Sequence, residues 1–110
     1  MIAAVAAVVF ASSLSLARAD DMSADRAWRL ASTYMMLHIS GCGGIKQPIA
    51  HRAYWELPVA YGRAGTPRGE VRVDRATEVV SYSFMGQHYP TLTPKQVADE
   101  EYAYTHRRWV

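Results

Sequence analysis

The sequence predicts a small α+β domain, in which an N-terminal helix packs on a three-stranded antiparallel sheet and a second helix follows at the C-terminus. Two observations predict this class. Apolar residues recur at helical spacing between residues 23 and 38, and they alternate with polar residues in three later segments. Alternation is the period of a half-buried strand. Residues 20–110 are enough for one domain with a modest core.

The sequence predicts a leader before this domain. Residues 2–10 are Ala, Val, Ile and Phe, and Ala17-Arg18-Ala19 stands before Asp20. An apolar core of about 7–15 residues that ends in an A-x-A site is typical of a secretory signal peptide. We therefore expect residues 1–19 to be a signal peptide and residues 20–110 to form one periplasmic or secreted domain. No Lys or Arg follows Met1 in the usual place, so the alternative is an apolar first helix that stays in the domain.

The first helix of the domain is expected over about residues 23–38. Ser23 can cap its first free N–H groups, and Asp25 lies in the first turn, where the helix dipole favours a carboxylate. The residues expected on its buried face are Ala27, Leu30, Ala31, Tyr34 and Leu37. Trp28, Met35 and Met36 widen this apolar surface, which indicates packing on more than one side.

Three strands are expected after a connection. Residues 54–61 form the first, residues 69–74 the second and residues 79–84 the third, with a loop at 62–69 and a turn at 74–78. The side chains expected to face inward are Trp55, Leu57, Val59, Tyr61, Val71 and Val73. Pro58 has no N–H to donate to a ladder, so it predicts either an edge strand or a bulge.

The C-terminal helix has a clear start. Thr93 can act as its cap, Pro94 suits the first helical position, and Gln96 completes a capping box. The apolar face that follows consists of Val97, Ala98, Tyr102 and Tyr104. This face is weak, so we expect the helix to be loosely docked.

The helix and the hairpin that follows carry a family resemblance. The residues that carry it are Ala27, Leu30, Ala31, Val71, Val73, Asp74, Thr77 and Val79. This order resembles the PepSY-type domain of exported bacterial proteins, in which a helix precedes a hairpin ending in V-D-x-x-T-G-x-V. Glu78 stands where that family prefers Gly. The order of a helix and a Trp-bearing strand is also similar to small NTF2-like immunity proteins. We rank this resemblance second, after the PepSY-type domain.

The resemblance implies a role in binding rather than in catalysis. PepSY-like domains are associated with inhibiting or modulating proteases of the cell envelope. The resemblance therefore implies a non-enzymatic envelope module that binds or modulates another protein, in a role like that of a protease inhibitor. Neither family pattern brings catalytic residues to this chain.

Several other function classes are disfavoured by composition and spacing. The net charge is only +2 and the basic residues are scattered, whereas nucleic-acid binding usually needs a basic stripe. The four histidines lack the close ligand pairs of zinc sites, and no phosphate-binding loop is present. We expect no metal, no cofactor and, once the leader is removed, no integral membrane segment. The sequence leaves the oligomeric state open.

One enzymatic alternative remains. Cys42 and His38 stand four residues apart, and a Cys–His pair can activate a thiolate. The negative end of a helix disfavours a thiolate, and the sequence shows no third group to orient the histidine. The alternative to a binding module is therefore a thiol-dependent enzyme centred on Cys42 and His38.

The partner surface is expected on the first strand. Pro58 marks a possible edge, where an incoming peptide strand could pair with the backbone. Tyr54 and Glu56 share the outward face of that strand with Pro58. We therefore expect Tyr54, Glu56 and Pro58 to bind a protein partner.

Export can be tested directly. Cleavage after Ala19 should leave Asp20 as the amino terminus of the mature protein, because the apolar run ends in an A-x-A site. Mass spectrometry of the protein from its native cell would show this. An intact Met1 in the cytoplasmic fraction would contradict it.

Overall fold

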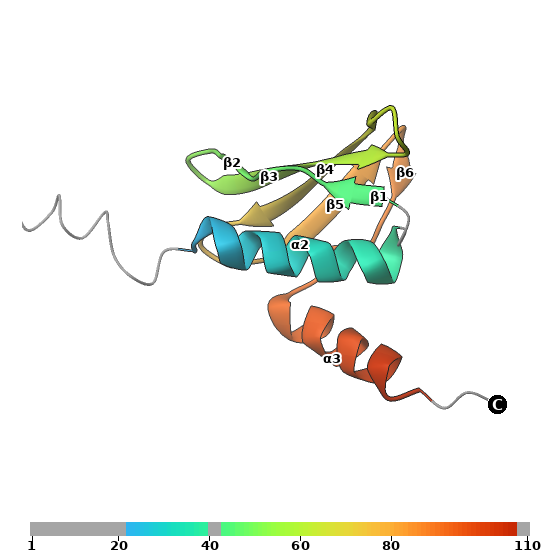
Figure 1. The fold of residues 1–110 in the computed structure, drawn as a ribbon. Coiled ribbons are helices and arrows are strands. Elements are labelled where there is room, and N and C mark those ends of the chain that lie inside the picture. Colours follow the sequence, from blue (N-terminus) through green and yellow to red (C-terminus); the bar gives the residue numbers. More distant parts are fainter. Residues whose placement is uncertain (1–21, 40–42, 108–110) are drawn as a thin grey trace, which may run out of the picture.

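The computed structural model describes residues 22–39 and 43–107 (Figure 1). The expected signal peptide and Cys42 lie outside these residues. The elements follow in the order α2 (Ala24–His38), β1 (Gly43–Ile45), β2 (Ile49–Ala50), β3 (Tyr54–Tyr61), β4 (Thr66–Asp74), β5 (Val80–Phe84), β6 (Gln87–His88) and α3 (Pro94–Thr105). Two helices and an antiparallel sheet confirm the expected α+β class.

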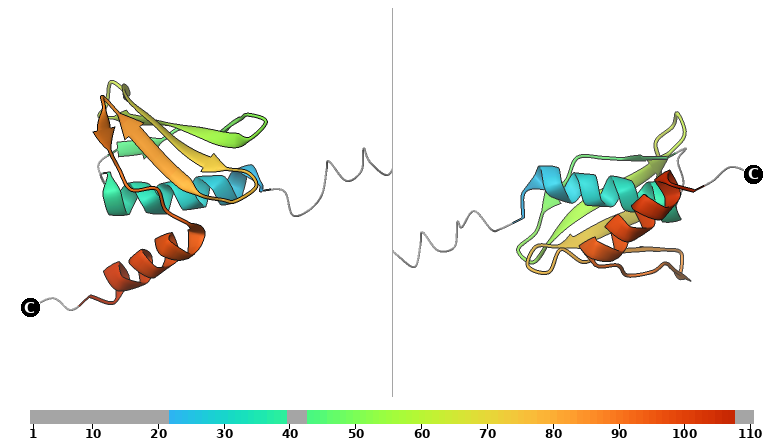
Figure 2. Two further views of the ribbon diagram at one scale, coloured as in Figure 1. Left: turned by 180° about the vertical axis from the view of Figure 1, so that it is seen from behind. Right: turned by 90° about the horizontal axis from the view of Figure 1, so that it is seen from below.

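The sheet has more strands than expected. Its order is β1-β3-β4-β5-β6, and β2 pairs with the same side of β3 as β1 does. Helix α2 lies along one face of the sheet, and α3 packs mainly on α2, farther from the sheet (Figures 1 and 2). Strand β4 begins at Thr66, within the stretch expected to be a loop. Strands β1, β2 and β6 have only two or three residues, too few for an alternating pattern to show.

The expectation that Pro58 marks an edge strand is wrong. Strand β3 pairs with β4 on one side and with β1 and β2 on the other. The carbonyl of Pro58 accepts a hydrogen bond from the N–H of Lys46 (2.8 Å), so its nitrogen faces the gap between β1 and β2. The register with β4 also shifts between Pro58 and Ala60. The structure therefore has a bulge next to this proline, which was the other arrangement that the sequence predicted.

The core lies between α2 and the sheet. The expected helix face is confirmed for Ala27, Ala31 and Tyr34, which are fully buried, and Met35 joins them. The sheet residues buried against them are Leu57, Val59, Val71, Val73, Val80 and Tyr82. The Tyr34 hydroxyl donates to the carbonyl of Pro90 (2.6 Å), and burial raises the pKa of this phenol to about 12. The core polar group is therefore satisfied and stays protonated.

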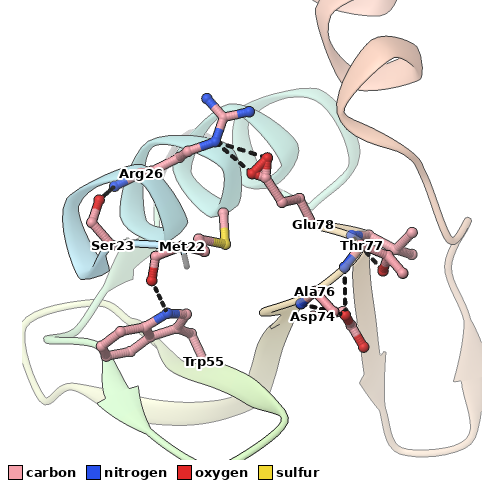
Figure 3. Close-up of polar contacts among 9 residues, drawn as sticks. Met22, Ser23, Arg26, Trp55, Asp74, Ala76, Thr77 and Glu78 are labelled. Carbon is pink, nitrogen blue, oxygen red and sulfur yellow. Dashed lines mark hydrogen bonds and ion pairs between the residues drawn. The ribbon is translucent and has the colours of Figure 1, made fainter. Parts of the chain in front are cut away.

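Helix α2 begins with the expected cap. The hydroxyl of Ser23 accepts a hydrogen bond from the N–H of Arg26 (Figure 3). Just before it, the carbonyl of Met22 accepts from the indole N–H of Trp55 (3.1 Å). Trp55 is thus half-buried and ties β3 to the start of the helix.

The turn between β4 and β5 also reaches this helix end. One carboxylate oxygen of Asp74 accepts from the N–H groups of Ala76 (2.9 Å) and Thr77 (2.7 Å), as expected of an Asp at a turn. Glu78 then has a left-handed backbone, with φ of 62°. Its two carboxylate oxygens accept from Nε of Arg26 at 2.9 and 2.7 Å (Figure 3). The backbone at residue 78 therefore has a conformation that suits glycine, and a glutamate adopts it here.

Glu78 offers a test that separates backbone strain from the ion pair. Replacing it with Ala or Gly removes the contact with Arg26, which we expect to be worth about 0.2–1 kcal/mol because Arg26 is half exposed. Only Gly also relieves the left-handed strain. The Glu78→Gly variant should therefore be more stable than Glu78→Ala by about 0.5–1 kcal/mol. Urea unfolding of both variants would measure this difference.

The dependence of stability on acid pH is a control for the ion pair between Arg26 and Glu78. The Arg26 guanidinium lowers the pKa of Glu78 below its ordinary value of 4.5. Its stabilisation is therefore complete above pH 4.5 and is lost as the pH falls through the lower pKa of the folded state. Both variants should lose this part of the acid sensitivity. Equal stability of the Gly and Ala variants at neutral pH would show that the backbone at residue 78 is unstrained.

Candidate functional site

The sequence-predicted site residues lie on the face of the sheet opposite α2. Leu57 and Val59 are buried beneath the helix, so Tyr54, Glu56 and Pro58 alternate with them onto the outer face. The structure thus keeps the three residues on one face. The strand edge on which their role was expected to depend is covered by β1 and β2. Their part in binding a partner stays a prediction.

Charged side chains on this outer face are paired with one another. The imidazole of His51 contacts the carboxylate of Glu56 (2.8 Å), and this hydrogen bond is the main reason that the pKa of Glu56 is lowered. Nε and an Nη atom of Arg72 donate to the same oxygen of Glu70 at 2.9 and 2.6 Å. The ring of Tyr54 lies 4.4 Å from the His51 ring and 4.6 Å from the guanidinium of Arg72. The face is a compensated polar network, as expected for the solvated side of an antiparallel sheet.

The side chain of His38 contacts Glu100, which the sequence pattern did not indicate. Its Nε2 contacts the carboxylate of Glu100 on α3, and its ring lies 5.1 Å from that of Tyr34. Glu100 is 62 residues away along the chain, so no local spacing could reveal it. The carboxylate supplies a group that can orient the histidine. Cys42 lies outside the described residues, so a Cys42–His38 pair stays a prediction.

A groove runs between α2 and β1. Its volume is about 390 Å³, and its described lining consists of Trp28, Ser32, Met35, Met36, Gly43, Gly44 and Ile45. None of these residues is ionisable. Trp28 is 45% exposed and Met36 41%, although both are large and apolar. We call this region the α2–β1 groove.

Gly43 sets how close β1 lies to the helix. A Cβ atom on Gly43 would stand 2.4 Å from the terminal methyl of Met35 and 2.3 Å from the ring of Tyr61. No side chain fits there without displacing both. A Cβ atom on Gly44 would meet no atom within 4 Å. Of these two glycines, only Gly43 therefore has no room for a side chain. This role of Gly43 depends on β1, a strand that the sequence did not reveal.

Residues 22–39 and 43–107 contain no group of three or more His, Cys, Asp or Glu side chains that could hold a metal ion. Among the same residues, neither helix has the length and apolar character needed to cross a membrane.

Comparisons of the chain with protein-family models, with curated proteins and with solved structures gave no match. The resemblances to PepSY-type and NTF2-like domains therefore stay predictions.

The contact of His38 with Glu100 predicts how firmly α3 is docked. Val97 is the one residue of α3 that is buried, and polar contacts with α2 are made by Glu100 with His38 and by Glu101 with Thr33 (3.5 Å). In a His38→Ala variant, amides in α3 should exchange about fivefold faster or more, which corresponds to a loss of about 1 kcal/mol. Hydrogen exchange followed by mass spectrometry would measure this.

A matched variant controls for this change. Lys95→Ala breaks an exposed ion pair with Asp99 within α3 (2.7 Å) and should leave exchange nearly unchanged. Amides of β3 and β4 should be unaffected in both variants. Unaltered exchange of α3 in the His38→Ala variant would show that packing alone holds this helix.

Proposed function

We propose that this chain is an exported, non-enzymatic module that binds another protein through the α2–β1 groove. The observation that carries the proposal is the exposure of Trp28 and Met36 along a groove beside the outermost strand of the sheet. The resemblance to PepSY-type domains supports a role in modulating an envelope protein such as a protease. No metal or cofactor is part of the proposal.

The chemistry of the groove suits protein recognition. Trp is enriched among the residues that contribute most to protein interfaces, and Met adapts its flexible side chain to different partners. A binding partner would remove Trp28 and Met36 from water, which is favourable for apolar surface. The described lining has no charge to desolvate, so little opposes this burial.

The outer face of the sheet is the less favourable surface. Its charged groups already pair with one another, as in the contacts of His51 with Glu56 and of Arg72 with Glu70. A partner that covered them would have to desolvate these pairs, and that penalty can exceed the attraction. The groove is therefore preferred to the surface of Tyr54, Glu56 and Pro58 that the sequence indicated.

Site-specific photo-crosslinking in the native cell tests this proposal. A photo-reactive amino acid would replace Met36 in the groove, Met85 in the exposed turn after β5, or Tyr54 on the outer face. We expect position 36 to give one discrete crosslinked protein, and position 85 to give none, because Met85 is exposed but lies outside the α2–β1 groove. A second change, Trp28→Ala, should weaken the crosslink from position 36.

Each of the other outcomes would decide between the two surfaces or between a binding module and an enzyme. A crosslink from position 54 but not from position 36 would place the partner on the outer face and overturn the choice of the groove. No discrete crosslink from any position would overturn the proposal of a binding module. A Cys42→Ser change should leave the crosslink intact. If it instead abolished a measured activity of a stable protein, the thiol-dependent enzyme would be the better description.

A further inference from the structure

We infer that the α2–β1 groove takes an extended segment of the partner protein, which adds to the sheet as a strand beside β1 and places uncharged apolar side chains at alternate positions against α2. This inference rests on the proposed function and specifies the chemistry of the partner. It follows from the backbone of β1, from the spacing of residues along α2 and from the character of the lining.

The backbone of β1 has one side available for pairing. The N–H of Lys46 donates toward β3, to the carbonyl of Pro58, and backbone groups change side at each residue of a strand. Gly44 therefore also points toward β3, whereas the N–H and C=O groups of Gly43 and Ile45 point away from it. Within residues 22–39 and 43–107, no strand pairs with this outer side of β1. Such an edge is a template for another strand.

The spacing along α2 matches the spacing of a strand. The lining residues Trp28, Ser32 and Met36 are four apart, so they succeed one another by about 6 Å along the helix axis. Side chains on one face of a strand succeed one another by about 6.6 Å. In Figure 1, β1 lies over the C-terminal half of α2 and runs back along it. A strand added to β1 would thus place every second side chain near one of these residues.

The lining determines which side chains fit. Trp28 and Met36 offer apolar surface, and the small Ser32 between them leaves room for a side chain. Because no described lining residue is ionisable, a charged side chain pointing into the groove would lose its hydration without gaining a partner. The inward positions of the bound segment are therefore uncharged and apolar, and the outward positions are free to be polar.

An extended segment is favoured over a helical one by the backbone groups. A helix satisfies its own N–H and C=O groups and would cover those of Gly43 and Ile45 without pairing them. An added strand pairs them and fills the groove at the same time. This combination of main-chain hydrogen bonds with alternate side-chain sites is the way that sheet edges recognise peptides.

A labelled peptide of defined pattern tests the inference. The probe is an eight-residue capped peptide in which valine alternates with threonine, and binding to the full chain is followed by fluorescence anisotropy. Trp28→Ala should weaken binding about tenfold, as loss of an interface anchor does. The controls are Tyr102→Ala on α3 and Met85→Ala, both exposed and outside the groove lining, and they should bind like the parent.

Methylation of the peptide nitrogens distinguishes strand addition from other modes. N-methyl groups on alternate residues of one phase remove the donors that face β1 and should abolish binding. The same groups on the other phase face away and should leave the affinity within about threefold, because those amides make no ladder bond. Equal loss in both phases, or no loss in either, would overturn the inference.

The remaining outcomes separate this inference from the proposed function. If position 36 crosslinks a partner but the peptide does not bind or shows no phase dependence, the groove binds protein in another way and only the inference fails. If the chain forms dimers that Trp28→Ala disrupts, the occupant is a second copy, which also overturns the inference. If the peptide binds in one phase and no cellular crosslink forms, the groove chemistry stands and the proposed role fails.

Discussion

Helix α2 approaches the sheet through two alanines, Ala27 and Ala31, and the rest of the structure depends on this close contact. Both are fully buried, and their small side chains let the helix lie against the valines of β4 and β5. Tyr34, one turn further on, donates its hydroxyl to the carbonyl of Pro90 in the connection between β6 and α3. Larger residues at the two alanine positions would separate the layers and overpack a well-filled core.

The same contact determines where function can reside. One face of the sheet is covered by α2 and the other carries paired charges, and Trp28 and Met36 leave apolar surface exposed at the margin where the helix and β1 meet. Trp28 and Met36 lie on the flank of α2, beside its buried face rather than on it. A helix whose apolar surface is wider than the sheet it covers leaves such a margin exposed.

Long periodic segments were predictable from the sequence, whereas short or distant features were not. The boundaries of β3 and the capped start of α3 follow from alternation and from Thr93, Pro94 and Gln96, and all are confirmed. Strand β1 has three residues, two of them glycines, so it carries no pattern. Pro58 was compatible with an edge or with a bulge, and only the pairing of β3 decides between them. The contact of His38 with Glu100 joins two helices that no spacing relates.

The candidate site was accordingly predictable in part. The width of the apolar surface on α2 was visible in the sequence, but its function as a groove wall requires β1, which was not. The outward phase of Tyr54, Glu56 and Pro58 was correct, because alternation fixes it, whereas the free edge assigned to them belongs to the neighbouring strand. The physical reason is that strand order is a long-range property, which local periodicity does not encode.

The tight fit of Gly43 against Met35 and Tyr61 bears on the kinetics of recognition. Because this contact is part of the folded core, the walls of the groove are held in place before any partner arrives. Partner binding of the kind proposed above would then require no prior rearrangement of these walls. Association of different partners would proceed at similar rates, limited by orientation, and their affinities would differ through how long each complex survives.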